Sequence, residues 1–256
     1  MVITVFIFIF GLVIGSFLNV VIYRLPRHQS LVYPPSHCPS CDRRIKPYDN
    51  IPLLSYVFLL GRCRYCRGRI SPRYPLVELL AGTIAALLSI RYGPGTDAAI
   101  LFILSSALIA ITFIDIDHGI IPNVLSYPGI VLGFLSSFLL HLNSPAGSLS
   151  GMLVGGGILL TVAYVYKKIA GVEGMGMGDV KLMVMLGAFL GWQASIFIII
   201  VSSLLGSIAG VGLMIFAGKT RKYAIPYGPF ISASAIVYLF YGRPLIDLYL
   251  KVIGHA

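Results

Sequence analysis

Charged side chains are scarce in this sequence. Asp, Glu, Lys and Arg make up 11% of its 256 residues, whereas hydrophobic residues make up 57%. A soluble domain of ordinary composition carries roughly 25% charged residues, and the mean hydropathy here is +0.91. The composition therefore excludes an ordinary soluble domain and indicates a protein embedded in a membrane.

Long apolar stretches recur along the chain. A helix needs about 20 mostly apolar residues to cross a hydrocarbon core ~30 Å thick, because each residue adds ~1.5 Å. We therefore predict an all-α polytopic membrane protein with about eight transmembrane helices, two of them short. The predicted stretches are Met1–Tyr23, Leu76–Ile90, Ala98–Ile114, Val124–Leu142, Leu149–Tyr166, Val180–Trp192, Ala194–Ala217 and Phe230–Tyr241.

Lys and Arg are distributed unevenly between the loops. Residues Arg24–Arg73 hold ten of the nineteen basic residues, while Tyr92–Asp97 and Asn143–Gly147 hold none. Short cytoplasmic loops carry the excess of basic residues, so Arg24–Arg73 is predicted to be cytoplasmic. Because no basic segment precedes Met1–Tyr23, we interpret this stretch as a retained anchor with its N-terminus outside.

Alternation from there places three further segments on the cytoplasmic side. They are Asp115–Asn123, Lys167–Gly178 and Gly218–Gly228, with Lys167, Lys168, Lys219, Arg221 and Lys222 among them. The net charge of +10 would otherwise suggest a nucleic-acid partner. Topology bias and anionic lipid headgroups account for it, so the expected partner is membrane lipid rather than nucleic acid. The protein is thus expected in a membrane with these basic loops on its cytoplasmic side.

Cysteine is rare, and every cysteine belongs to a Cys-x-x-Cys motif. The four residues form two Cys-x-x-Cys pairs, Cys38 with Cys41 and Cys63 with Cys66, which 21 residues separate. Such pairs suit the tetrahedral ligation of a structural zinc ion, which leaves no position for a catalytic water. Two disulfides are the alternative, although they seldom persist in a reducing cytoplasm. Residues 24–73 are too few to hold a core unaided, and zinc is the expected staple.

Acidic residues number only nine, so those beside apolar stretches stand out. Ionisable groups at membrane depth are costly and mark functional sites. Asp115 closes the third stretch and Asp179 opens the sixth, both at the predicted cytoplasmic boundary. Two facing carboxylates can hydrolyse a peptide bond, because one stays protonated as the acid while the other activates water. We predict that Asp115 and Asp179 are catalytic.

Two glycines, Gly176 and Gly178, come just before Asp179. Without a Cβ, their backbone can adopt otherwise forbidden dihedrals and approach a substrate strand closely. A flexible hinge is the alternative. We predict that both glycines position substrate.

Three other ionisable residues leave alternatives open. Asp117 and His118 could join Asp115 in a metal site, but hard cations need more oxygen ligands than are evident. The favoured interpretation is that both face the cytoplasmic boundary as supporting residues. Glu78 lies one turn inside a stretch and should face the interior or a partner cation.

Glycines also recur at a spacing of four. Such pairs let helices approach closely, either within one bundle or between copies of a chain. Packing within the bundle is the favoured role, and the oligomeric state stays open. The pairs are Gly11 with Gly15, Gly151 with Gly155, and Gly206 with Gly210.

Together these motifs resemble those of the type IV prepilin peptidases. The resemblance covers nearly the whole chain. It includes the four cysteines, GLVIGSFLNVVIYRLP at 11–26, SPRYPLVE at 71–78, DIDHGIIPN at 115–123 and EGMGMGDVKL at 173–182. An Asn at position 123, where the family often has Asp, departs from the pattern without touching the catalytic pair.

The resemblance implies an aspartic endopeptidase of the Gly-x-Gly-Asp class with Asp115 and Asp179 as its catalytic residues. Such enzymes cut after a Gly at the cytoplasmic face and remove the short basic leader of prepilins and of type II secretion pseudopilins. It also implies N-methylation of the new N-terminus with S-adenosyl-L-methionine. The sequence shows no Rossmann-type strand, turn and helix, so the methyl donor rests on resemblance alone.

The implied domains are a first transmembrane helix (1–23), a cytoplasmic zinc-binding loop (24–73) and a transmembrane aspartic peptidase domain (74–256). Two other classes of function are alternatives. An ion or solute transporter would also place carboxylates at membrane depth, and an assembly module could use the cysteine loop for docking. Only the peptidase requires both aspartates.

Overall fold

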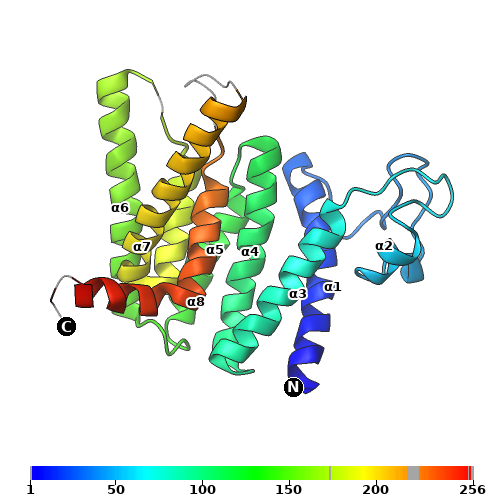
Figure 1. Ribbon diagram of the computed structural model, residues 1–256, viewed down its shortest axis with the longest axis horizontal. Helices are drawn as coiled ribbons and strands as arrows, with labels where there is room; N and C mark the ends of the chain where they lie inside the picture. Colours follow the sequence, from blue (N-terminus) through cyan, green and yellow to red (C-terminus); the bar gives the residue numbers. More distant parts are fainter. Residues whose placement is uncertain (1, 173, 218–224, 253, 255–256) are drawn as a thin grey trace. The chain divides into compact units, whose positions relative to one another are not determined.

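The computed structural model describes residues 2–172, 174–217, 225–252 and 254. Their regular secondary structure is helical (Figure 1), and most of the segment between α1 and α3 consists of turns. The α-helices are α1 (Val2–Arg24), α2 (Leu54–Phe58), α3 (Arg73–Tyr92), α4 (Thr96–His118), α5 (Asn123–Ser136), α6 (Pro145–Ala170), α7 (Met177–Ala217) and α8 (Gly228–Val252). Two short 3-10 helices, η1 (Leu25–Arg27) and η2 (Pro47–Asp49), lie between α1 and α2 along the chain. The predicted all-α fold is confirmed.

The chain forms two compact units, residues 1–110 and 111–256. Helix α4 begins in the first unit and ends in the second. The division into 1–23, 24–73 and 74–256 follows expected membrane boundaries rather than packing, and it stays a prediction.

In the first unit, α1 and α3 lie side by side (Figure 1). Small residues make the contact. A Cβ placed on Gly11 would lie 2.8 Å from the Cα atom of Gly82, and one on Gly15 would lie 2.6 Å from the Cα atom of Glu78. This pair of glycines therefore packs two helices of one chain together.

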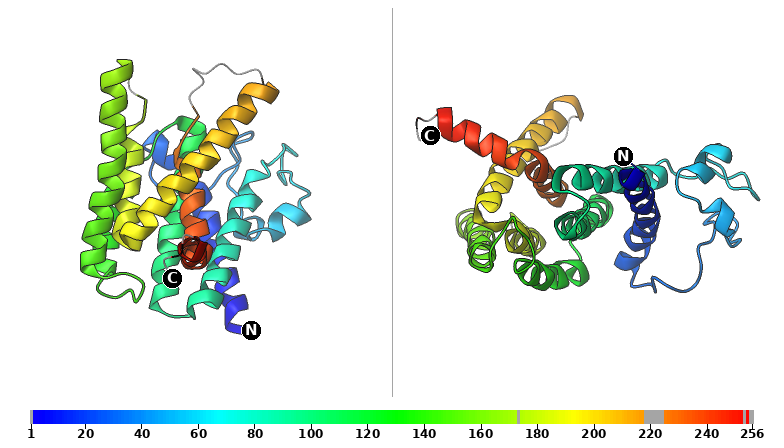
Figure 2. Two further views of the ribbon diagram at one scale, coloured as in Figure 1. Left: turned by 60° about the vertical axis from the view of Figure 1, so that its left-hand side comes forward. Right: turned by 90° about the horizontal axis from the view of Figure 1, so that it is seen from below.

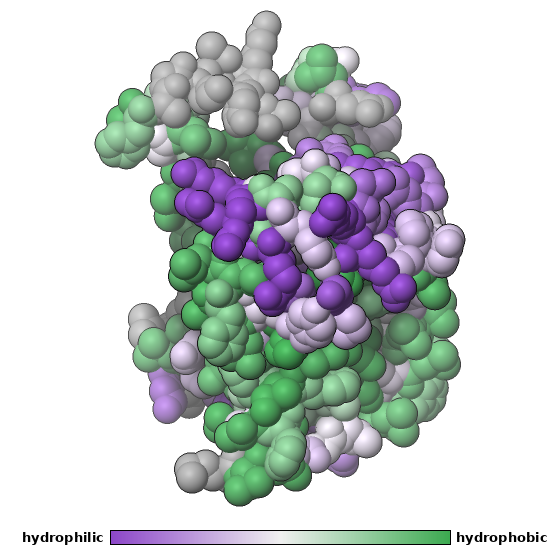
Figure 3. Space-filling view, turned by 90° about the vertical axis from the view of Figure 1, so that its right-hand side faces the viewer, coloured by the Kyte–Doolittle hydropathy of each residue, from purple (hydrophilic) through white to green (hydrophobic). Residues whose placement is uncertain are grey.

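The outer surface of the first unit is divided by polarity. Large side chains of α1 stay exposed, such as Phe6 at 67% and Phe10 at 58%. Hydrophilic residues gather over the segment between α1 and α3, and hydrophobic residues cover the surface beside it (Figure 3). Exposed Phe, Val and Ile along a whole helix are the expected surface toward lipid.

In the second unit, α7 packs against α5, α6 and α8 (Figure 2). Helix α7 is broken at Gly191, where φ is 84° and ψ is −179°. The break frees backbone carbonyls, and side chains satisfy them. The amide of Asn143 donates to the carbonyls of Ala188 and Phe189 at 3.3 Å each, and the hydroxyl of Ser195 donates to that of Gly191 at 3.1 Å.

Seven of the eight predicted stretches lie in helices, apart from Met1, which is outside the described residues. The other stretch, Val124–Leu142, continues past the end of α5 at Ser136. Among the described residues, five helices are long and apolar enough to cross a membrane: α1, α3, α4, α6 and α7. Two apolar helices are shorter, α5 and the Gly228–Gly242 part of α8. The stretch Val180–Trp192 ends one residue after the break in α7 at Gly191, and the stretch Ala194–Ala217 follows the break. The chain is a multi-pass membrane protein by this measure, and the number of eight spans stays a prediction.

The predicted loop Lys167–Gly178 begins inside a helix in the structure. Helix α6 continues to Ala170, so Lys167 and Lys168 lie in its last turn, where basic residues interact favourably with the helix dipole. Within the expected loops, Glu173, Lys219, Arg221 and Lys222 lie outside the described residues.

We predict that Gly151→Ala destabilises the protein and that Gly157→Ala, on the same helix, does not. A Cβ at Gly151 would overlap the carbonyl oxygen of Gly187 on α7, whereas one at Gly157 would meet nothing within 4 Å. Overpacking costs about 1–3 kcal/mol, while Gly to Ala in a free helix position gains up to about 1 kcal/mol. Thermal unfolding in detergent measures both. Equal melting temperatures for the two variants would contradict the close α6–α7 contact.

Candidate functional site

The two predicted catalytic aspartates lie together in the second unit. Asp115 belongs to the last turns of α4, and Asp179 to the first turn of α7. Both are buried, with 5% and 9% of their surface exposed. Their carboxylates are close enough to repel each other. The fold thus brings together two acids that are 64 residues apart in the sequence.

Each carboxylate lies at the N-terminal end of a helix. The backbone N–H of Gly228, the first residue of α8, donates a buried hydrogen bond of 3.0 Å to Oδ2 of Asp115. The Asp179 carboxylate interacts with the backbone of Gly176, directly before α7. Helix N-termini carry partial positive charge and free N–H groups, so both ends stabilise negative charge in this apolar setting.

Of the two glycines predicted to position substrate, Gly178 is explained by the close approach of a neighbouring side chain. A Cβ on Gly178 would lie 3.0 Å from the Cβ atom of Ile121, and one on Gly228 would lie 3.4 Å from Cδ1 of the same side chain. Ile121 therefore fills the space between these two glycines. Of the described glycines, Gly176 and Gly178 are not among those with positive φ, so the expectation of forbidden dihedrals at these positions is wrong.

The neighbouring polar residues do not form a second site with the pair. Asp117 and His118 are exposed, unlike Asp115. Among the residues that the structure describes, the only group of three or more potential metal ligands is the cysteine cluster. The metal alternative for Asp115, Asp117 and His118 therefore has no support. Asn123 accepts a hydrogen bond of 2.9 Å from Nζ of Lys181, so it ties the start of α5 to α7.

The four cysteines form one cluster in the first unit. Their Sγ atoms all lie within 4.8 Å of one another, and those of Cys38 and Cys66 are 3.8 Å apart. Four sulfur ligands at ~2.3 Å from a tetrahedral zinc ion lie roughly 3.8 Å from each other. All four are free thiols, so the disulfide alternative has no support, and the cluster fits a metal ion.

The two cysteine pairs have the same backbone geometry. In the first pair, the N–H of Cys38 donates to the carbonyl of Arg43, and the carbonyl of Cys38 accepts from the N–H of Asp42. In the second pair, the N–H of Cys63 donates to the carbonyl of Gly68, and the carbonyl of Cys63 accepts from the N–H of Arg67. Asp42 and Arg67 both have positive φ, 55° and 58°. Each pair is thus a tight knuckle that turns its N–H groups toward sulfur. Backbone N–H groups of Cys66 and Tyr65 lower the pKa of Cys63 to about 7, which favours the thiolate that metals bind.

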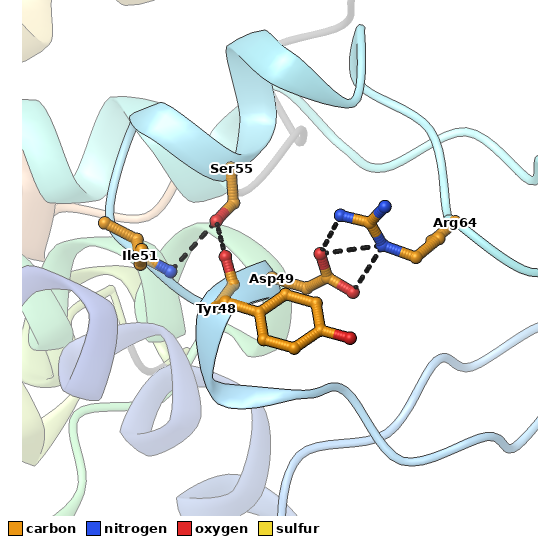
Figure 4. A network of polar contacts seen from close by, with 5 residues as sticks. All are labelled: Tyr48, Asp49, Ile51, Ser55 and Arg64. Atoms are coloured by element: carbon orange, nitrogen blue, oxygen red, sulfur yellow. Dashed lines mark hydrogen bonds and ion pairs between the residues drawn. The ribbon is translucent and has the colours of Figure 1, made fainter.

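A polar network attaches the second knuckle to η2 (Figure 4). The guanidinium of Arg64 donates to both carboxylate oxygens of Asp49, at 2.6–3.0 Å. This pairing lowers the pKa of Asp49. The hydroxyl of Ser55 donates to the carbonyl of Tyr48 and accepts from the N–H of Ile51, each at 3.0 Å. Few apolar side chains are buried in this segment, so ligands, turns and charge pairs hold its shape.

Glu78 faces the interior, as predicted, but its partner is not a cation. The carboxylate accepts the backbone N–H of Leu53 at 2.8 Å and is 8% exposed. Leu53 has a φ of 60° and precedes α2. Glu78 therefore anchors the start of α2 to α3, and this contact joins the cysteine segment to the helices of the first unit.

Fold and site together define a helical membrane protein that holds two buried carboxylates side by side. Comparison with known proteins gives its family. Residues 9–92 match the model of the Bacterial Peptidase A24 N-terminal domain, and residues 102–211 match that of the Type IV leader peptidase family. This chain therefore belongs to the type IV leader peptidase family, which confirms the resemblance found in its motifs. No solved structure matches it significantly.

Three curated relatives are named prepilin leader peptidase/N-methyltransferase. The one from Aeromonas salmonicida (strain A449) is 36% identical over 276 residues, which cover 96% of this chain and 94% of the relative. Those from Aeromonas hydrophila and Pseudomonas aeruginosa are 37% and 35% identical and cover 95% of this chain and 92% of each relative. These comparisons give no support to the transporter alternative.

We predict that the purified protein contains about one zinc ion per chain, held by Cys38, Cys41, Cys63 and Cys66. Replacing one cysteine of each pair, in Cys41→Ser/Cys66→Ser, should release the metal and lower the melting temperature. Ser40→Ala, in the same knuckle, should keep both. Metal analysis and thermal unfolding measure the outcome. A zinc-free preparation with an unchanged melting temperature would contradict a structural metal.

Proposed function

We propose that this protein is a membrane-embedded aspartic endopeptidase that removes the short basic leader from type IV prepilins and pseudopilins. Asp115 and Asp179 are its catalytic residues. The observation that carries the proposal is the buried pairing of these two carboxylates in a chain of the leader peptidase family. Gly176 and Gly178 line the path by which an extended substrate reaches the pair.

The chemistry follows from two acids in one dry site. Two negative charges this close are costly, so the pair holds one proton between them. The ionised carboxylate takes a proton from water, and the water oxygen bonds to the scissile carbonyl carbon. The protonated carboxyl donates its proton to the carbonyl oxygen, which gives a tetrahedral diol. When the diol collapses, the C–N bond breaks and the leaving amine takes up a proton.

Methylation of the new N-terminus belongs to the same proposal, because the relatives are named for both activities. The methyl group comes from S-adenosyl-L-methionine. The described residues pair extended backbone only at two single bridges, His37 with Arg44 and Arg62 with Arg69. Since they contain no nucleotide-binding strand, turn and helix, we assign no residue to the methyl donor.

The proposed orientation places the N-terminus outside and the cysteine segment and active site at the cytoplasmic face of the inner membrane. The excess of Lys and Arg between α1 and α3 supports it. A prepilin would then present its basic leader to the cytoplasm and its apolar helix to the membrane, with the cleavage point at the level of the aspartates. The exposed apolar side chains of α1 contact lipid.

We predict that Asp115→Asn and Asp179→Asn each abolish cleavage of a prepilin N-terminal peptide. Asn keeps the shape but cannot supply or accept the proton, so kcat should fall by about 10⁴-fold. Because the dyad acts as a unit, the double variant should lose little more. Peptide cleavage in detergent measures this.

Asp117→Asn is the matched control. Asp117 is two residues from Asp115 on the same helix but exposed, so this variant should keep kcat within about tenfold. Near-normal cleavage by a folded Asp179→Asn protein would disprove the dyad.

We predict that Gln29→Cys and Ala146→Cys label from opposite sides of the membrane. Both positions are exposed and lie in segments assigned to opposite sides by the distribution of charge. An impermeant maleimide added to spheroplasts should modify Ala146→Cys at once and Gln29→Cys only after the membrane is permeabilised. The unsubstituted protein gives the background from its own cysteines. Labelling of both variants in intact spheroplasts would refute the orientation.

A further inference from the structure

The Asp115 carboxylate receives one hydrogen bond from the described residues, and it comes from the backbone of Gly228. The bond is buried, 3.0 Å long, and bridges 113 positions of sequence. A donor on one oxygen restricts the rotation of the carboxylate. The position of the Gly228 N–H therefore influences how Asp115 faces Asp179.

The residue before Gly228 is itself held in place. The hydroxyl of Tyr227 forms hydrogen bonds with those of Ser202, at 2.7 Å, and Ser203, at 3.1 Å. Both serines belong to the part of α7 that follows the break at Gly191, and Ser202 is fully buried. Tyr227 thus fixes the start of α8 against α7, one residue before the N–H that Asp115 uses.

The space at Gly228 admits no side chain. A Cβ there would lie 2.7 Å from Oδ2 of Asp115 and 3.3 Å from its Cγ atom. The first distance is shorter than 3.0 Å, and real Cβ atoms essentially never approach another heavy atom so closely. Gly228 does not have positive φ, so its backbone conformation is open to any residue. Among the described neighbours, the Asp115 carboxylate is the group that a Cβ at this position would overlap.

We propose that Tyr227 and Gly228 form a positioning element for the catalytic pair. The Gly228 N–H orients Asp115 and stabilises its charge, and Tyr227, anchored on Ser202 and Ser203, holds that N–H in place. This inference rests on the proposed function, because it assigns a role in the reaction of the dyad. Neither residue touches the scissile bond.

Gly228→Ala tests the first half. The added methyl group should displace Asp115 by a few tenths of an ångström or more, and kcat for peptide cleavage should fall about 100-fold with KM unchanged. Gly157→Ala is the matched control, since it adds the same methyl group to a helix where nothing lies within 4 Å. A merely structural defect would lower the melting temperature and the yield of active enzyme instead of kcat alone.

Tyr227→Phe tests whether Tyr227 holds the Gly228 N–H in place. This variant also decides whether the positioning element exists if Gly228→Ala does not fold. Loss of the hydroxyl should lower kcat about three- to tenfold with KM unchanged. Ser202→Ala removes one of the two hydrogen bonds of this hydroxyl and should lower kcat by the same amount or less. The double variant should lose no more than Tyr227→Phe alone, because that variant already lacks the contact with Ser202.

The controls separate this inference from the proposed function. If the unsubstituted protein does not cleave prepilin peptide, or Asp115→Asn cleaves it normally, the proposed function fails. If the unsubstituted protein cleaves and Asp115→Asn does not, the positioning role is tested alone. It is overturned when folded Gly228→Ala, or Tyr227→Phe, keeps kcat within twofold of Gly157→Ala.

Discussion

The burial of negative charge at the edge of an apolar bundle is the constraint on which the second unit depends. Two carboxylates removed from water destabilise a fold unless protons or dipoles compensate them. Here α7 begins at one aspartate and α8 begins at the other. The N-terminal ends of both helices converge on the pair. The helix arrangement therefore supplies the compensation, since no Lys or Arg among the residues that the structure describes forms a hydrogen bond with either carboxylate. A site that must exchange a proton gains from this, because a direct ion pair would hold one charge state.

The first unit meets a different problem in a different way. Its segment between α1 and α3 is polar and small, and it buries too little apolar surface to fold by that alone. Two knuckles of identical geometry gather four thiols, one Arg–Asp pair attaches the second knuckle to η2, and Glu78 joins α2 to α3. Each contact is polar and local. Their sum replaces a hydrophobic core.

Much of this could be predicted from the sequence because the informative residues are rare in it. Asp115, Asp179 and the four cysteines stand out in a chain with few charges and no other thiols, and an apolar chain restricts the backbone to helices. The contact from Gly228 could not be predicted, since every residue except proline has a backbone N–H and none marks its partner. The role of Glu78 escaped for the same reason. The predicted boundary between Val180–Trp192 and Ala194–Ala217 lies close to the break at Gly191, but the sequence alone does not show which glycine adopts the non-helical conformation.

The break in α7 links the geometry of the proposed active site to a point far along the helix. Asp179 lies on the arm before Gly191, and the serines that anchor Tyr227 lie on the arm after it. Each arm is roughly 17 Å long between the break and these residues, at ~1.5 Å per residue. A change of about 3° in the angle at Gly191 would therefore shift one arm's tip by nearly 1 Å relative to the other, and shifts of that size are known to alter catalytic rates strongly. Asn143 and Ser195 hold the backbone at the break. They therefore affect how the two carboxylates of the proposed dyad are aligned, although neither residue lies beside them in the sequence.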